Sequence, residues 1–200
     1  MPKSITLAVT GASGMPYVIA LLKELLARED VLVNFVISKA GIVTMHQELG
    51  ISLSHNPQLT REKLLEAIDI KIADKFNVYG IEDWYAPVAS GSSVADVTIV
   101  CPCTMATLAK IANGIGDDLI ARSADVAIKE RKNLILVPRE TPFSAIHLEN
   151  MLKLAQLGVS IIPPIPAFYT HPATIDDMVN FVVSRILDQA GIGNSLISRW

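Results

Sequence analysis

An arginine and a glutamate stand side by side in the stretch VPRETPFS (137–144), directly after the apolar run NLIL. The guanidinium of Arg139 can bind a phosphate or a carboxylate through two parallel hydrogen bonds, and the carboxyl group of Glu140 can move a proton. Pro138 and Pro142 reduce the freedom of this turn, which suits side chains that must hold a position. The alternative is an exposed ion pair at a turn, which stabilises a fold very little.

A turn of small residues, TGASG (10–14), follows the first apolar run and leads into a helical pattern. Its glycines let a ligand approach the backbone closely, and the start of the following helix offers N–H groups to an anion. The second apolar run ends in Ser38 and Lys39 and lacks the acidic residue that binds the ribose of NAD. The pattern therefore favours a mononucleotide such as FMN over NAD, and the alternative is a tight turn without a ligand.

Two further turns carry hydroxyl groups. In CPCTMAT (101–107), Thr104 can cap the next helix and Thr107 offers a second hydroxyl one turn later, although capping alone also explains this pattern. The turn ASGSS (89–93) could hydrogen-bond a flat ligand or phosphate oxygens, but taken alone it is a loop. Neither turn by itself is evidence for a ligand site, and each supports one only together with the other strand ends.

Cations and acidic doublets lie on predicted helices. Arg122 and Lys129 are seven residues apart, so they share roughly one helix face. Arg185 stands among apolar neighbours, where an arginine is either a surface residue with a buried stem or a buried anion clamp. The doublets 117–118 and 176–177 lie on or before helices, and this position favours capping over magnesium binding.

A regular alternation of elements must position these residues. Buried strands are predicted at 5–11, 31–38, 96–102, 133–138 and 159–164, and helices at 15–28, 40–49, 60–73, 104–113, 117–131, 144–157 and 174–190. This rhythm predicts a Rossmann-like α/β fold, a doubly wound parallel sheet in a single domain over residues 1–200. Ligands bind beyond the carboxyl ends of the strands in such sheets. Each predicted strand is followed there by polar side chains, glycines or prolines. The stretches 50–60 and 79–94 are the longest irregular ones, which makes them candidate lids or interface loops.

Composition excludes several classes of protein. Half of the 200 residues are apolar, 18% are charged, and the mean hydropathy is +0.40, yet no apolar run approaches the roughly 18 residues that span a membrane. The first residues do not have the pattern expected of a signal peptide, because TGASG interrupts the apolar run. The surplus apolar surface therefore predicts buried parallel strands and subunit contacts. A net charge of −3 gives no field for nucleic acid, and Cys101 and Cys103 suit buried thiols in a reducing cytoplasm.

The sequence resembles the flavin prenyltransferase family of the UbiX type over essentially its whole length. The resemblance is carried by TGASG, by CPCTMATLAKIANGIGDDLIARSADVAIKERKNLILVPRETPFS (101–144) and by PAFYTHP (166–172). It implies a flavodoxin-like sheet in a large homo-oligomer, commonly a dodecamer, with active sites at subunit interfaces. It also implies a cytoplasmic enzyme, and an older description of such proteins as aromatic acid decarboxylases.

Site residues follow from this resemblance position by position. The flavin-binding positions are matched by Gly11, Ala12, Ser13, Ser38, Thr104, Met105, Ala106, Thr107 and Arg139. The loop near the prenyl group is matched by Ser90, Gly91 and Ser92, with Arg122 as a phosphate ligand. The allylic phosphate site is matched by Tyr169 and Arg185 with Lys129 nearby, and the active-site carboxylates by Glu48 and Glu140.

The implied reaction joins the dimethylallyl group of dimethylallyl monophosphate to N5 and C6 of reduced FMN, without a metal. Lys129, Tyr169 and Arg185 would stabilise the departing phosphate, and Glu140 or that phosphate would carry protons. Trp84 and Trp200 could line the prenyl pocket, or they could simply pack in an interface. The implied product serves a UbiD-type decarboxylase, with ubiquinone biosynthesis as the natural pathway. Two alternatives remain: an FMN-dependent aromatic acid decarboxylase and a non-catalytic FMN carrier.

Overall fold

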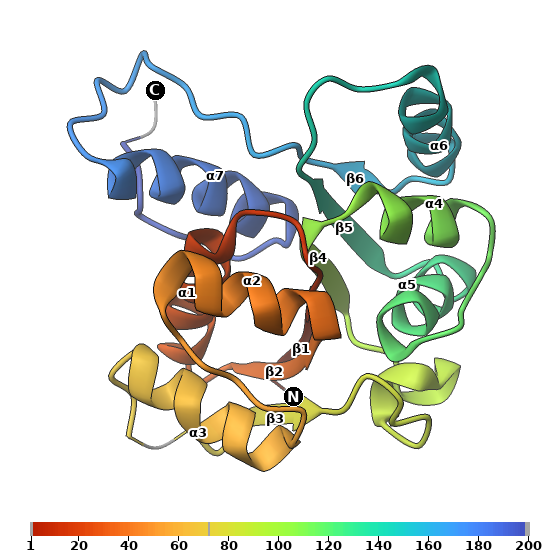
Figure 1. Ribbon diagram of the computed structural model, residues 1–200, viewed down its shortest axis with the longest axis horizontal. Helices are drawn as coiled ribbons and strands as arrows, with labels where there is room; N and C mark the ends of the chain where they lie inside the picture. Colours follow the sequence, from red (N-terminus) through yellow and green to blue (C-terminus); the bar gives the residue numbers. More distant parts are fainter. Residues whose placement is uncertain (1, 72, 199–200) are drawn as a thin grey trace.

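A computed structural model describes residues 2–71 and 73–198 of the chain (Figure 1). In this part of the chain, strands and helices alternate almost throughout. In order they are β1 (Lys3–Val9), α1 (Met15–Leu26), β2 (Val31–Ile37), α2 (Lys39–Leu49), α3 (Pro57–Ala67), β3 (Phe76–Tyr79), η1 (Pro87–Ala89), η2 (Gly91–Ser93), β4 (Val97–Cys103), α4 (Met105–Ala112), α5 (Leu119–Lys129), β5 (Asn133–Pro138), α6 (Ala145–Gln156), β6 (Ser160–Ile161) and α7 (Ile175–Gln189).

The strands form one parallel sheet in the order β3-β2-β1-β4-β5-β6. The chain first builds outward from β1 to β3, then returns to place β4 beside β1 and builds toward β6. The switch of direction between β1 and β4 is the place where doubly wound sheets bind their ligands. The predicted Rossmann-like fold is confirmed.

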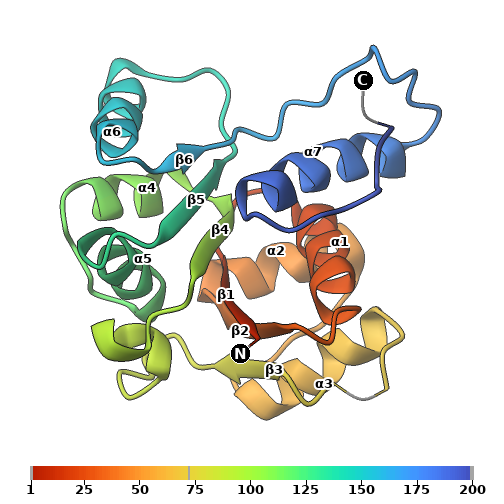
Figure 2. The ribbon, with the colours of Figure 1, turned by 180° about the vertical axis from the view of Figure 1, so that it is seen from behind.

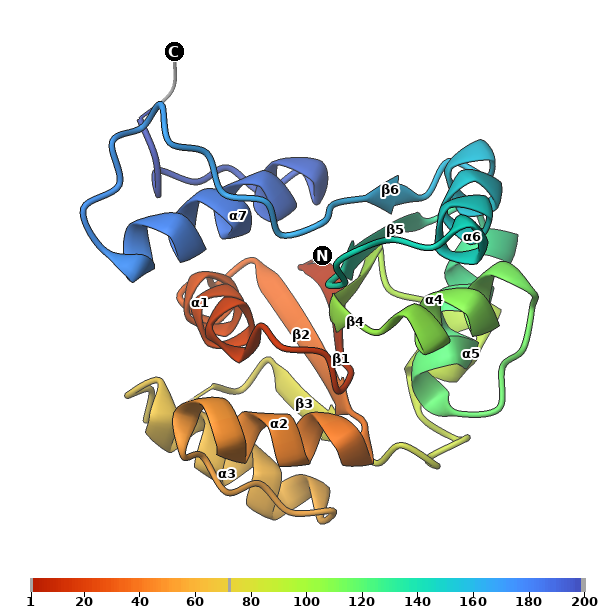
Figure 3. The same ribbon diagram turned by 45° about the horizontal axis from the view of Figure 1, so that its top comes forward.

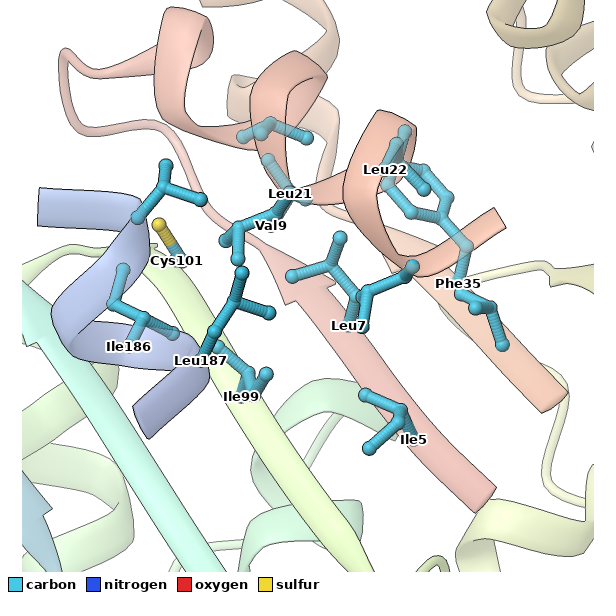
Figure 4. Close-up of a cluster of buried hydrophobic side chains, with 14 of the residues drawn as sticks. Ile5, Leu7, Val9, Leu21, Leu22, Phe35, Ile99, Cys101, Ile186 and Leu187 are labelled. Carbon is cyan, nitrogen blue, oxygen red and sulfur yellow. The ribbon is translucent and has the colours of Figure 1, made fainter. Parts of the chain in front are cut away.

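Helices cover both faces of the sheet (Figures 2 and 3). On one face α1 packs against α7 and α2, and on the other α4 and α5 pack together. Each face buries its own hydrophobic core. Figure 4 shows side chains of the core under α1 and α7, which come from the sheet (Ile5, Leu7, Val9, Phe35, Ile99 and Cys101), from α1 (Leu21 and Leu22) and from α7 (Ile186 and Leu187). Because both faces are covered, the central strands carry apolar residues almost without interruption, as the sequence indicated.

The sequence prediction was wrong around residues 50–79. Helix α3 begins at Pro57 rather than at residue 60, because Asn56 accepts a hydrogen bond from the Leu59 N–H and proline is well suited to a first helical position. The edge strand β3 was missed because it has only four residues and begins inside a charged stretch. Arg61 ties it in place by donating to the carbonyl oxygens of Phe76 and Ala73 at 2.9 and 2.8 Å.

The sixth strand is shorter than predicted. Only Ser160 and Ile161 pair with β5, although apolar residues continue to position 164. Pro163 and Pro164 have no N–H groups to donate to a neighbouring strand, so pairing stops before them. In the described ranges, no helix combines the length and the apolar character that crossing a membrane requires.

Candidate functional site

Four strand ends meet at the carboxyl edge of the sheet, around the switch point. Thr10 donates its hydroxyl to the Pro102 carbonyl oxygen at 2.8 Å, and the same hydroxyl accepts the Thr104 N–H at 2.8 Å. The Ser38 N–H donates to the Val9 carbonyl oxygen at 2.9 Å, and the Arg139 N–H donates to the Cys103 carbonyl oxygen at 3.3 Å. The structure therefore brings the ends of β1, β2, β4 and β5 together, and with them many of the predicted flavin contacts.

The turn after β1 lies tightly against the start of α2. A Cβ atom on Gly11 would overlap Ala40, and the Thr44 hydroxyl donates to the Gly11 carbonyl oxygen at 3.2 Å. Within the described residues, no hydrogen bond of the fold uses the backbone N–H groups of Ala12 and Ser13. Small residues, backbone donors and the Ser38 hydroxyl thus share one place, and this set suits a phosphate-bearing ligand.

Glu48 from α2 caps the start of α1. Its carboxylate accepts the N–H groups of Gly14 and Met15 at 3.0 and 2.8 Å. Burial raises the pKa of Glu48, but the Ser13 hydroxyl, these two N–H groups and the Arg139 charge together hold it below its ordinary value. The first free donors of α1 are therefore taken by a carboxylate of the chain itself, which neutralises the helix dipole there.

Replacement of this carboxylate is expected to affect stability in a pH-dependent way. A lowered folded-state pKa stabilises the fold above the ordinary glutamate value, and the contribution is lost as the pH falls through the folded value. Glu48→Gln should therefore lower the free energy of unfolding by about 1 kcal/mol at neutral pH, as for a lost helix cap, and by much less near pH 3.

Urea unfolding of wild type and variant at both pH values measures this difference. Glu149→Gln is the matched control, because Glu149 is an exposed glutamate on α6 that caps no helix. An equal loss at both pH values would contradict the capping role of Glu48.

The start of α4 combines a cap with exposed small residues. The Thr104 hydroxyl accepts the Thr107 N–H at 3.1 Å and donates to the Thr107 hydroxyl at 2.9 Å, so the predicted capping is confirmed. Ala106 is exposed, whereas the side chain of Met105 is buried, as is that of Ala12 in the first turn. A ligand at this edge would therefore meet the backbone of Met105 and Ala12 rather than their side chains.

Arg139 and Glu140 are exposed on the turn after β5. Glu140 accepts its neighbour's N–H, that of Thr141, at 3.1 Å. None of the ion pairs between described residues joins Arg139 to Glu140, so a simple surface salt bridge does not explain the turn. The positive charge of Arg139 instead contributes to lowering the pKa of Glu48.

A second group of predicted site residues lies elsewhere. Lys129 ends α5, shortly before β5 begins, and forms an ion pair with Glu130. A Cβ atom on Gly91 would lie only 2.8 Å from the Lys129 Nζ atom, so the turn with Ser90 and Ser92 packs directly on this end of α5. This group therefore lies toward the amino edge of the sheet.

Arg122 connects this group to the first turn of α5. Its Nε atom donates to the Ala89 carbonyl oxygen at 3.2 Å, and its Nη1 atom lies 3.1 Å from Asp125 Oδ2. The long side chain of Arg122 thus supports the start of the ASGSS turn, and the assignment of this turn to the prenyl group stays a prediction.

A third group lies along α7. The rings of Tyr169 and Phe181 meet edge to face, with their centroids 5.9 Å apart. Arg185 follows Phe181 by one helical turn, so both lie on one side of α7. Its side chain is 52% exposed, and it is therefore a surface residue rather than a buried anion clamp.

One chain does not bring all three groups to a single point. A strand of seven residues such as β4 is about 23 Å long, so Lys129 and Gly91 are separated from Arg139 by roughly the length of the sheet. The assignments of these residues stay predictions, and they fit one reaction centre only if two copies of the chain contribute to it.

Several other sequence interpretations can be compared with the structure. Asp118 caps α5, and Asp177 completes the capping box of α7 by accepting the N–H of its N-cap residue Thr174, so the capping interpretation of both doublets is confirmed. Trp84 is 48% exposed, whereas Trp200 lies outside the described residues. Cys101 and Cys103 are free thiols, and burial raises both pKa values, that of Cys103 to about 12.

Sequence reasoning missed three residues at the carboxyl edge. Thr10 and Thr44 fasten the first turn, and the half-buried Tyr17 packs beside Gly14. Burial, followed by the charges of Cys101 and Glu48, raises the pKa of Tyr17. Only Thr10 carried a signal, since it directly precedes the small-residue turn.

Comparison with known proteins identifies one family, both from a family model and from individual relatives. The model of the family described as Flavoprotein matches residues 1–187. The flavin prenyltransferase UbiX of Pseudomonas aeruginosa is 48% identical over 199 residues, which cover 100% of this chain and 94% of the relative.

Two solved structures are similar over nearly the whole chain. A dodecameric FMN-dependent UbiX-like decarboxylase from Escherichia coli O157:H7 has a TM-score of 0.86 and 41% identity, covering 98% of both chains. AnUbiX, in complex with FMN and dimethylallyl pyrophosphate, has a TM-score of 0.85 and 40% identity, covering 100% of this chain and 98% of the other.

Proposed function

The chain belongs to the UbiX-type flavin prenyltransferases of the Flavoprotein family, and from this we propose that it joins the dimethylallyl group of dimethylallyl monophosphate to N5 and C6 of reduced FMN. The observation that carries the proposal is the meeting of Gly11–Ser13, Ser38, Thr104 and Arg139 at one edge of the sheet. Their backbone donors, hydroxyls and cation fit a flavin mononucleotide, and the full-length relatives share this fold.

Each part of the chain then has a chemical role. Bound reduced FMN supplies a nucleophilic nitrogen, N5. The carboxyl-edge residues hold the flavin, with Arg139 as a charge-assisted donor to it. Tyr169, Arg185 and Lys129 stabilise the negative charge that develops on the departing phosphate. Glu140, which is exposed and accepts the N–H of the neighbouring Thr141, moves a proton.

A reaction centre that uses all these residues requires a second copy of the chain. We place it where the amino-edge group of one copy, Lys129 and the Ser90–Ser92 turn, faces the carboxyl edge of another. Exposed apolar side chains support such assembly, since Ile146, Leu148 and Leu152 on α6 and Phe168 beside Tyr169 are each more than half exposed. The dodecameric relative provides a precedent.

The product's use is a further part of the proposal. A UbiD-type decarboxylase in the cytoplasm is the proposed recipient of prenylated FMN, in ubiquinone biosynthesis. Free buried thiols at Cys101 and Cys103 are compatible with a reducing compartment.

The function is tested by the product. The protein, FMN reduced without oxygen, and dimethylallyl monophosphate should yield a flavin with a changed absorption spectrum and the added mass of one dimethylallyl group. Parallel reactions with oxidised FMN, without protein, and with dimethylallyl pyrophosphate identify the required redox state, the catalyst and the preferred phosphate.

Recovery of unmodified FMN from a tightly binding protein would indicate a carrier instead. Release of carbon dioxide from an aromatic acid, without flavin modification, would favour the FMN-dependent decarboxylase. Formation of the modified flavin in the complete reaction alone supports the transferase.

A further inference from the structure

Arg185 has a carboxylate partner on its own helix. Its Nη1 atom lies 3.1 Å from Asp188 Oδ2, one turn later on α7. The two side chains differ in exposure, with 52% of Arg185 and only 22% of Asp188 accessible. The carboxylate is therefore the more fixed member of the pair, and the guanidinium extends from it toward solvent.

Asp188 is itself held by the segment that follows α7. The Asn194 side-chain amide donates to Asp188 Oδ1 at 3.2 Å and approaches the Ser184 carbonyl oxygen at 3.4 Å. The Asn194 oxygen accepts the Leu196 N–H at 3.4 Å. A continuous series of hydrogen bonds thus runs from the C-terminal segment through Asp188 to Arg185.

Arg185, at the end of this series of hydrogen bonds, lies on the same side of α7 as the predicted phosphate site. Phe181 contacts Tyr169 and precedes Arg185 by one helical turn, so a ligand bound at Tyr169 lies within reach of the same side of α7. Without Asp188, Arg185 would have the rotamer freedom of a long exposed side chain. Binding a phosphate would then require that freedom to be lost.

We propose that Asp188 and Asn194 are positioning residues, which hold the Arg185 guanidinium ready for the phosphate of the allylic substrate. The inference rests on the proposed function for the identity of that phosphate monoester. Asp188 uses one nitrogen of the guanidinium, and an arginine has further donors in a planar fork to offer a phosphate. The pair therefore orients Arg185 without occupying all of it.

Binding to protein loaded with oxidised FMN tests the proposal, because no turnover is needed. Calorimetry should show that Asp188→Asn weakens the affinity for dimethylallyl monophosphate about tenfold, the middle of the range for coupled neighbours, and leaves FMN affinity unchanged. In an Arg185→Ala background the same substitution should have no further effect. Asp176→Asn is the matched control, since it removes the same charge from an exposed position on the same helix.

A second variant separates positioning from loss of charge. Asn194→Ala keeps both charges and removes the hydrogen bond to Asp188, so it should weaken monophosphate binding several-fold, again only when Arg185 is present. It also keeps the test decisive if Asp188→Asn does not fold.

Three results would overturn the proposal: tighter binding by Asp188→Asn, the same weakening in the Arg185→Ala background, or no loss of affinity in Arg185→Ala itself. Intact coupling without any flavin modification would instead refute the proposed reaction while supporting the positioning role. A wild-type protein that does not bind the monophosphate would contradict both.

Discussion

Co-expression of Lys129→Ala and Arg139→Ala copies is expected to raise prenyl transfer well above the level that either variant reaches alone. Lys129 lies toward the amino edge of the sheet and Arg139 at the carboxyl edge, so one chain cannot direct both at the same small substrate. If each reaction centre takes Lys129 from one copy and Arg139 from another, random assembly leaves about one quarter of the centres intact.

The measurement is the rate of modified-flavin formation by purified mixed oligomers, compared with each variant and with wild type. Arg139→Ala combined with Glu140→Gln is the matched control, because both residues lie on the turn after β5 at the carboxyl edge. Copies that both fail in the same half of the site should not rescue each other. Absence of rescue in the Lys129 and Arg139 mixture would show that the two residues do not serve one shared centre.

Substitutions of the adjacent residues Arg139 and Glu140, on the turn after β5, are expected to impair different steps, namely FMN binding and product formation. Arg139→Ala should weaken FMN binding about 10- to 150-fold, because a hydrogen bond from a charged donor contributes about 1.5–3 kcal/mol. Glu140→Gln keeps the size of the side chain, and it should leave FMN affinity nearly unchanged while slowing product formation about 100-fold or more.

Fluorescence titration with FMN and single-turnover formation of the modified flavin provide the two readouts. Thr141→Ser is a suitable control on the same turn, since it keeps the N–H that Glu140 accepts. Turnover near the wild-type rate in Glu140→Gln would refute proton transfer by Glu140. Unchanged FMN affinity in Arg139→Ala would remove Arg139 from the flavin site.

Local sequence patterns were sufficient to predict the fold class, and they pointed to the carboxyl edge of the sheet as the place for a ligand. Strand-like and helical patterns depend on neighbouring residues, and so do caps such as Thr104 and Asp118, which bond to N–H groups three residues away. Parallel strands then place all their carboxyl ends at one edge, which is why separate motifs along the chain could be assigned to a common site.

Only the tertiary structure decided how the site is divided and supported. Glu48 caps a helix that starts 33 residues earlier, Asn194 reaches back to Asp188 behind Arg185, and Gly91 packs on Lys129 at the opposite edge. Such contacts depend on how helices and loops pack after the sheet has formed, and no local pattern encodes their distance in space. Residues that match the family could therefore indicate the reaction. The packed fold showed that the predicted site residues of one chain lie in separate groups.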